Sequence, residues 1–369
     1  MITKIKSVIP KPIKTFKREV VWHYNNIRPP IYGNEEKDLF LGPWLGDVGK
    51  ELYHWIPYLR RLKADGRLRY KNIYAVSRGG VENWYSGIAD GYVEILDYFD
   101  SEFYSEPFFR SHKRHLGKKV PKKTNFGNDG QNQWRISPIE KKLIENYANQ
   151  NNIKNYEIFH PSNMWHNTRR FQVHWKNQAL CLQEISKTSL FEKFEMVTQK
   201  YSDIVDRLDL PDDYIAAKFY FHPTNLLETD ENKKYINQYI EKLSNKKKIV
   251  DLSAPISVDE VKPYLAGEGN PNVFRVPSIS CENINLGVQT ELIRRSQGFV
   301  GTLGGLSLLP ALLGKPHLAF FSGQIQDIHP NYCYEMMLFS YVYEELHGLP
   351  FKSTDIRRVN LLGNLFPDS

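Results

Sequence analysis

The hydrophobic and polar positions of this chain follow two periods. Short continuous apolar runs are typical of buried strands, whereas apolar residues spaced three or four apart are typical of helices. In the N-terminal half the pattern predicts strands at 39–41 and 72–77 around a helix at 51–62. In the C-terminal half it predicts strands at 214–221, 248–252, 272–276, 298–300 and 317–321, and helices at 231–243 and 286–295. Strands that alternate with helices indicate parallel α/β sheets.

The same pattern divides the chain into four parts. We expect a basic N-terminal arm at 1–37, a Rossmann-like domain at 38–207, a second at 208–345 and a tail at 346–369. Further helices are predicted at 137–152, 187–201 and 334–346. The fold class is therefore predicted as α/β, with two doubly wound Rossmann-like domains whose strand-end loops face each other across a cleft.

A glycine-rich turn at 301–305 separates the strand at 298–300 from an apolar helix at 306–313, which Gly314 is expected to end in a left-handed cap. Backbone N–H groups at such a helix start favour a phosphate or diphosphate. We expect Gly304 and Gly305 to let the ligand approach the backbone, with hydroxyl donors from Thr302 and Ser307. The alternative is that these glycines only permit tight packing of strand on helix. Neither the P-loop nor the dinucleotide fingerprint is present.

Composition and charge narrow the class of protein. The 369 residues are 41% hydrophobic and 13% aromatic, which is enough for packed cores. The net charge of +7 is concentrated partly in the arm and in a cluster at 113–123. Basic clusters of this kind contact nucleic acid, anionic lipid or anionic substrates, or are simply solvated loops.

The three cysteines lie far apart, which favours a reduced compartment and argues against a zinc site. We expect no metal and no cofactor. The start of the chain lacks the apolar segment of a signal peptide, and no apolar run is long enough to span a bilayer. The predicted location is the cytoplasm, with peripheral contact at the inner face of a membrane through the basic arm.

With both glycine loops placed, the chain resembles the GT-B class of glycosyltransferases. The segment 299–316 is similar to the nucleotide-sugar diphosphate loop of that class, in which a short glycine turn opens a helix that ends in Leu-Gly-x-Pro. Gly46-Asp47-Val48, followed by Pro57, is similar to a motif of the heptosyltransferase family. The resemblance implies that Asp47 is the base acting on an acceptor hydroxyl. The alternative for Asp47 is an ordinary helix N-cap.

Further candidates complete the expected site. Glu51, one helical turn after Asp47, is the substitute base, and Arg78 is expected to bind an anionic acceptor or donor. For donor binding we expect Lys218 to reach the leaving phosphate, His222 to lie at the same strand end and Glu291 to contact a ribose. Residues of these types also serve structural roles on edge strands and helix surfaces.

These observations predict a glycosyltransferase that moves a sugar from a nucleotide-sugar donor to a glycan or lipid-linked acceptor. We expect it to be metal-independent and inverting. One alternative is a sugar-nucleotide epimerase of the same fold, and another is an inactive relative that only binds sugar. A nucleic-acid-binding protein is the alternative from a different class, although no such module is recognisable and no nucleic-acid partner is expected.

Overall fold

The computed structural model describes residues 32–99, 133, 135–168, 178–194, 198–222, 225–253, 262–276, 282–322, 340, 342, 344, 346 and 353–357. The expected basic arm up to residue 31, the basic cluster at 113–123 and most of the helix expected at 334–346 lie outside these residues. No helix within the described ranges has the length and apolar character needed to cross a membrane.

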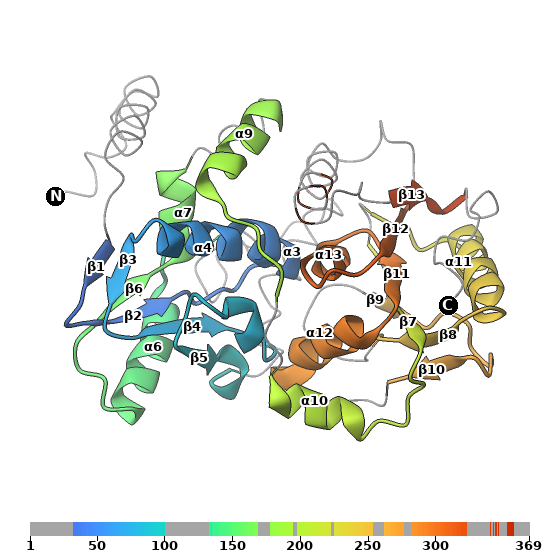
Figure 1. The fold of residues 1–369 in the computed structure, drawn as a ribbon, viewed down its shortest axis with the longest axis horizontal. Coiled ribbons are helices and arrows are strands. Elements are labelled where there is room, and N and C mark those ends of the chain that lie inside the picture. Colours follow the sequence, from blue (N-terminus) through green and yellow to red (C-terminus); the bar gives the residue numbers. More distant parts are fainter. Residues whose placement is uncertain are drawn as a thin grey trace.

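The N-terminal sheet is entirely parallel. Its strands run in the order β5 (Gly91–Glu94), β4 (Ile73–Ser77), β2 (Asp38–Leu41) and β6 (Tyr156–Phe159). Helix α4 (Ile56–Ala64) packs on one face and α6 (Pro138–Gln150) on the other. A small parallel pair, β1 (Tyr32–Asn34) and β3 (Leu68–Tyr70), forms a separate sheet (Figure 1). Helices on both faces make this a doubly wound unit.

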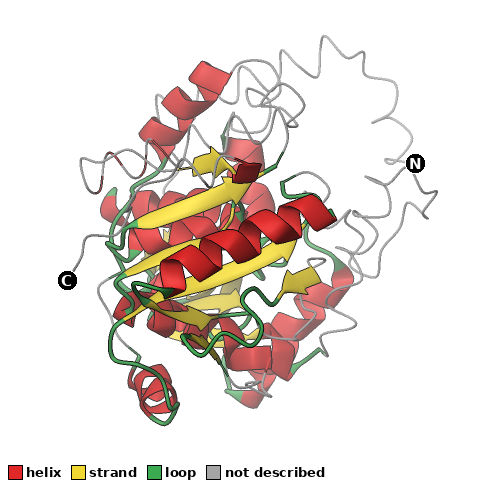
Figure 2. Ribbon diagram, turned by 90° about the vertical axis from the view of Figure 1, so that its right-hand side faces the viewer, coloured by secondary structure: helices red, strands yellow, loops and turns green. Residues whose placement is uncertain are grey.

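The C-terminal sheet repeats that arrangement. Its parallel strands run in the order β10 (Val273–Arg275), β8 (Lys248–Asp251), β7 (Tyr214–Phe221), β11 (Gly298–Thr302), β12 (His317–Phe321) and β13 (Ser353–Asp355), and β9 (Lys262–Tyr264) pairs antiparallel with the end of β7. Helix α11 (Asp230–Ser244) lies across one face, in front in Figure 2, and α12 (Asn285–Arg295) and α13 (Leu309–Leu312) cover the other.

Both sheets place their strands in the chain order third, second, first, fourth. This is the Rossmann order, in which ligands bind outside the carboxyl ends of the strands where the order reverses. The reversal lies between β2 and β6 in one sheet and between β7 and β11 in the other. The predicted α/β class with two Rossmann-like sheets is confirmed.

The remaining elements are short or connect the sheets. Three consecutive pieces, α3 (Val48–Lys50), a π-helical turn η1 (Glu51–Trp55) and α4, form one continuous helix after β2. The others are η2 (Glu82–Tyr85), η3 (Ile95–Asp97), α7 (Pro161–Asn167), α9 (Gln178–Thr188), α10 (Gln199–Asp206), η4 (Glu282–Ile284) and η5 (Gly305–Leu308).

Local sequence signals predict the ends of several helices and strands. The strands β7 and β12 have the bounds predicted for them. In α6, Ser137 and Glu140 form a capping box around Pro138, so the helix begins where its sequence signals indicate. Gly314 has the expected left-handed backbone, with φ 70°.

Two predicted helices differ from the structure. The helix expected at 187–201 is wrong: α9 ends at Thr188 and α10 begins at Gln199. Between them the N–H of Leu190 donates to Pro57 and that of Phe194 to Leu312, so these groups serve tertiary contacts. The helix expected at 306–313 begins as the 3₁₀ turn η5, and only 4 residues are α-helical. Pro310 lacks the N–H that a regular helix from 306 would need.

One hydrophobic cluster joins the two sheets. It includes Leu39 and Leu59 on the N-terminal side and Leu292, Leu309 and Phe321 on the C-terminal side. In Figure 1, α3 lies next to α13 at the centre of the view. Helix α10 precedes the predicted domain boundary but packs against α12, where Arg295 pairs with Asp206. The boundary itself, and the cleft expected between the sheets, stay predictions.

Candidate functional site

The loop from Gly42 to Asp47 leaves the carboxyl end of β2, at the reversal point of the N-terminal sheet, and leads into α3. From Asp38 to Gly49 every residue is buried except Asp47. The Asp47 side chain is 31% exposed, and its Oδ1 accepts a hydrogen bond of 2.7 Å from the N–H of Lys50. Its Oδ2 lies 3.6 Å from Lys50 Nζ. Asp47 is therefore the N-cap of α3 and, at the same time, the carboxylate that this buried loop presents to solvent.

The backbone of this loop is held from several elements. Gly42 N–H donates to Phe159 O at 3.0 Å and Trp44 N–H donates to Val76 O at 2.9 Å. The side chain of Gln133 accepts from Leu45 N–H at 2.8 Å and donates to Pro43 O at 2.7 Å. Gln133 also bonds Glu140, which in turn contacts His160 Nε2 at 3.0 Å. The loop is thus anchored to both neighbouring strands and to a buried polar network.

Glu51 and Arg78, predicted as substitute base and acceptor contact, form a buried ion pair with an Nη1–Oε2 distance of 3.0 Å. Glu51 is 0% and Arg78 1% exposed. The other oxygen of Glu51 accepts from the hydroxyls of Ser77 at 2.5 Å and Tyr85 at 2.6 Å. Burial raises the pKa of Glu51, and the Arg78 guanidinium offsets part of that rise. Both roles stay predictions, although in this arrangement neither side chain offers surface to a ligand.

The late glycine turn is shorter than the predicted 301–305: Gly301 and Thr302 pair with Ala319 and Phe320 and are the last residues of β11. The turn therefore begins at Leu303, next to the reversal point of the C-terminal sheet. Thr302 Oγ1 accepts from Tyr220 N–H at 3.0 Å and donates to Tyr220 O at 2.8 Å, which joins β11 to β7. Ser307 Oγ donates to Gly304 O at 2.6 Å and accepts from its N–H at 3.1 Å. The two hydroxyls expected to donate to a diphosphate therefore have internal partners. Because η5 and α13 are short, the dipole at this turn is also weaker than a longer helix would supply.

The glycines of this turn are packed closely. A Cβ on Gly304 would lie 1.7 Å from the hydroxyl oxygen of Tyr220. A Cβ on Gly305 would lie 2.4 Å from Gly49 N, and a Cβ on Gly49 would lie 2.8 Å from Gly305 Cα. The packing role considered for the glycines is thus present, and their contact with a diphosphate stays a prediction.

The structure brings the two glycine loops into contact through Gly49 and Gly305. Between Gly298 and Leu312 only Gly305 is not buried. Gly305 touches Gly49, and a Cβ on Gly49 would lie 3.2 Å from Asp47 Oδ1. The partly exposed carboxylate of Asp47 therefore lies two residues before the point at which the two loops touch.

The other expected donor residues are spread along the C-terminal sheet. Lys218, on β7, donates from Nζ to Gln289 Oε1 on α12 at 2.8 Å. His222 follows β7, and its N–H donates to Leu226 O. Both lie towards the carboxyl end of β7. Their roles in donor binding stay predictions.

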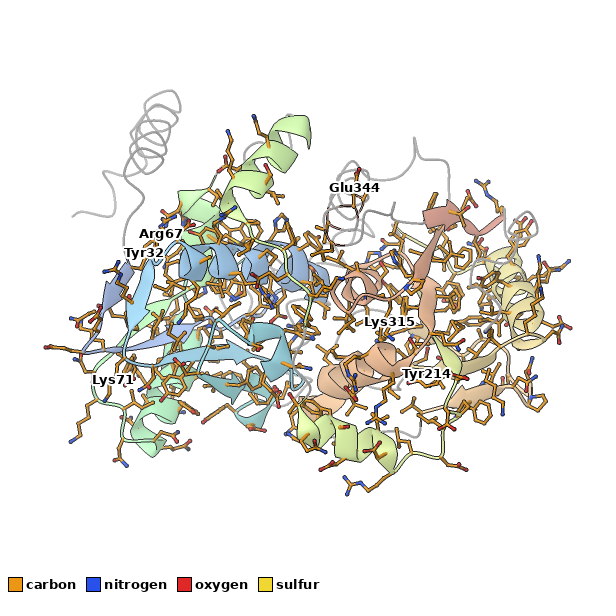
Figure 3. All side chains as sticks on the ribbon, viewed as in Figure 1. Tyr32, Arg67, Lys71, Tyr214, Lys315 and Glu344 are labelled. Carbon is orange, nitrogen blue, oxygen red and sulfur yellow. The ribbon has the colours of Figure 1, made fainter. Side chains whose placement is uncertain are left out.

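Glu291 lies towards the opposite edge of this sheet. Tyr214, the first residue of β7, donates to Leu292 O, so this part of α12 adjoins the amino end of β7; Figure 3 labels Tyr214 together with Lys315, which precedes β12. Burial favours the neutral form of Glu291, but hydrogen bonds from Arg294 and Arg295 outweigh it and lower its pKa. Glu291 is 2% exposed. Its predicted ribose contact is not supported by this placement.

Sequence reasoning missed Asp251 and Ser253 at the carboxyl end of β8. Asp251 Oδ1 accepts from Ser253 N–H at 2.9 Å, whereas Asp251 Oδ2 and Ser253 Oγ are buried and find no hydrogen-bond partner among the residues that the structure describes. Burial raises the pKa of Asp251. The available signal was an aspartate that ends a buried strand. Within the described residues, no group of three or more His, Cys, Asp or Glu side chains is placed to hold a metal ion.

Comparisons with known proteins give distant likenesses. No family model matches the chain, and no curated protein matches it. Among solved structures, E. coli ADP-heptose lps heptosyltransferase II is 11% identical, with 86% of this chain and 89% of that chain covered and a TM-score of 0.41. A glycosyl transferase family 9 protein from Veillonella parvula is 12% identical, with 79% and 82% covered and a TM-score of 0.40. UDP-GlcNAc 2-epimerase from Methanocaldococcus jannaschii is 10% identical, with 82% and 91% covered and a TM-score of 0.34.

Proposed function

We propose that this chain is a glycosyltransferase that moves a sugar from a nucleotide-sugar donor to an acceptor hydroxyl, with Asp47 as the general base. The observation that carries the proposal is that the segment carrying Asp47 contacts Gly305 through Gly49. Asp47 and Gly305 are each the solvent-facing point of an otherwise buried loop, and each loop follows a strand next to the reversal point of a Rossmann-ordered sheet. Ligands of such sheets bind at these strand ends.

The donor is assigned to the C-terminal sheet. A nucleoside diphosphate placed outside β7 and β11 would meet the backbone at Gly305 and the ammonium group of Lys218, which supplies positive charge for the leaving phosphate. The buried Oδ2 of Asp251 lies at the end of β8, the second strand of the sheet. An acidic residue at that position in a Rossmann sheet suits a ribose hydroxyl. Asp251 is therefore assigned to the ribose in place of Glu291.

The acceptor is assigned to the side of Asp47. Its carboxylate takes the proton of the acceptor hydroxyl as the oxygen bonds to the sugar and the bond to the diphosphate breaks. Direct attack by the acceptor without a covalent sugar–enzyme intermediate inverts the anomeric carbon. A glycan or lipid-linked acceptor, metal independence and contact of the basic arm with a membrane belong to the same proposal.

The donor assignment is tested by a thermal-shift screen with UDP, GDP, ADP, CMP and their sugars. A ligand present at 100 times its Kd stabilises the folded state by about 2.7 kcal/mol. We therefore expect a clear rise in the unfolding midpoint for one nucleotide series. If none of these nucleotides shifts the midpoint at millimolar concentration, the proposed function is wrong.

The base assignment is tested with Asp47→Asn. General base catalysis contributes roughly 10²- to 10⁴-fold, so we expect turnover to fall by that factor while nucleotide affinity changes only a few-fold. Asp65→Asn, which alters an exposed carboxylate at the far end of the same helix, is the matched control. Undiminished transfer by Asp47→Asn would remove Asp47 from the mechanism. Conversion of the donor sugar without any acceptor would instead favour an epimerase.

A further inference from the structure

Arg78 follows β4 and reaches into the loop that carries Asp47. Its Nη2 donates to Gly46 O at 2.7 Å, and its Nη1 donates to Glu51 Oε2 at 3.0 Å. These two acceptors lie on either side of Asp47 in the chain. Gly46 O belongs to the peptide bond that enters Asp47, and the N–H of Glu51 donates to Asp47 O at 3.2 Å.

Stability alone is a weak explanation for this pair. Removing two charges from water carries a desolvation penalty that often exceeds their attraction, and apolar side chains of similar volume frequently stabilise a core as well or better. A planar guanidinium, however, can hold two acceptors in a fixed relation, which apolar groups and a lysine ammonium do not reproduce.

Glu51, one of the two acceptors of the Arg78 guanidinium, is itself held by hydrogen bonds. Ser77 and Tyr85 both donate to Glu51 Oε1, so the carboxylate that receives Arg78 is fixed at its other oxygen. Glu51 also begins the π-helical turn η1, and such turns are frequent at functional sites. A continuous set of hydrogen bonds therefore connects the end of β4, through Arg78, to the peptide bond before Asp47.

We propose that Arg78 is a positioning residue for Asp47, and that its buried fork with Gly46 and Glu51 sets the direction of the Asp47 carboxylate. This inference rests on the proposed function in one respect: the direction of the Asp47 carboxylate affects catalysis only if Asp47 is the general base. A misplacement of about 1 Å at a reacting group can cost on the order of 10²-fold in rate, so a clamp of this kind affects turnover more than substrate binding.

The test uses the double variant Arg78→Met/Glu51→Gln, which removes both buried charges and keeps an amide oxygen for the hydroxyls of Ser77 and Tyr85. Arg60→Met is the matched control, since Arg60 is another buried arginine that forms an ion pair, with Glu192, and lies further along the same continuous helix. Arg78→Lys is the conservative variant. The first measurement is hydrogen exchange of the backbone amides of Lys50 and Glu51, which donate to Asp47 and need no substrate to be observed.

We expect the double variant to exchange these two amides at least tenfold faster than the unaltered protein, with a similar unfolding midpoint, whereas Arg60→Met leaves them unchanged. We also expect kcat to fall tenfold or more with KM for the donor altered less than threefold, and Arg78→Lys to recover only part of the loss. Unchanged exchange in the double variant, or an equal effect of Arg60→Met, would overturn the inference. A wild-type chain that turns over no nucleotide sugar would count against the proposed function. The exchange measurement would still show whether Arg78 and Glu51 hold the backbone around Asp47.

Discussion

The contact between Gly49 and Gly305 supports the sharpest prediction about this protein. These two residues lie in α3 and η5, which follow strands of different sheets, and a side chain on either has no room. A Cβ on Gly305 would lie 2.4 Å from Gly49 N and 3.0 Å from Gly49 Cα, and a Cβ on Gly49 would lie 2.8 Å from Gly305 Cα. The atoms in the way belong to the backbone and cannot rotate aside, so either alanine must move one loop away from the other.

The size of the effect follows from these distances. Ordinary carbon contacts are about 3.5–4 Å, so each alanine forces a displacement of roughly 1 Å. Overpacking of this kind typically costs about 1–3 kcal/mol. The costs of Gly49→Ala and Gly305→Ala should not add, because the first substitution already separates the loops. We expect each single variant to lose about 2 kcal/mol and the double variant to lose little more, a coupling of about 1–2 kcal/mol.

The assay is a double-mutant cycle of urea unfolding. Gly87→Ala is the control: nothing lies within 4 Å of its Cβ, and its φ of 74° makes the cost one of backbone strain, about 1–2 kcal/mol. Its effect should add to that of Gly49→Ala. If Gly49→Ala and Gly305→Ala also add, or if neither changes stability, the two loops are not in contact in solution. The proposed function, which depends on the contact between the Asp47 loop and Gly305, would then fail.

Two further predictions concern the groups around these loops. Burial raises the pKa of Glu94 to about 7, so the folded protein holds the Glu94 proton more tightly than the unfolded chain does. The stability that this proton contributes is complete below the unfolded pKa near 4.5 and is lost as the pH rises through 7. Relative to Glu94→Gln, the unfolding free energy should therefore fall by up to about 3 kcal/mol between pH 4 and 8, and parallel pH profiles of the two proteins in urea would contradict this. Gly304→Ala should lower the thermal midpoint because its Cβ meets the Tyr220 hydroxyl oxygen at 1.7 Å. Adding Tyr220→Phe should recover part of that loss, and a further decrease in the double variant would show that the clash lies elsewhere.

Much of the fold could be predicted from local patterns. The strands β7 and β12 have their predicted bounds because each is a mainly apolar segment, interrupted only by Lys218 or opened by His317, between polar or glycine-rich breaks. The start of α6 follows from Ser137, Pro138 and Glu140, whose capping effects act within one turn. Such signals depend on neighbours in sequence and need no knowledge of the rest of the chain.

The expected helix at 187–201 failed for the opposite reason. The backbone N–H groups of Leu190 and Phe194 donate to Pro57 and Leu312, which are distant in sequence. Helical spacing of apolar residues cannot reveal that a segment's hydrogen bonds are used for contacts with other elements. Residues 306–308 were likewise assigned to an α-helix from their apolar character, although Pro310 already limited where a regular helix could begin.

The candidate site likewise has features that the sequence predicts and features that only the tertiary structure shows. Residue types and spacing were sufficient to single out Asp47, Arg78 and the glycine turn at 301–305, because carboxylates, cations and glycines at strand ends are recognisable locally. The contact of Gly49 with Gly305, and the pairing of Arg78 with Glu51, depend on how two sheets pack through one shared apolar cluster. Burial and ion pairing are properties of that packing, which brings together residues far apart in the chain, and they decide which of the predicted side chains face solvent and which hold the others in place.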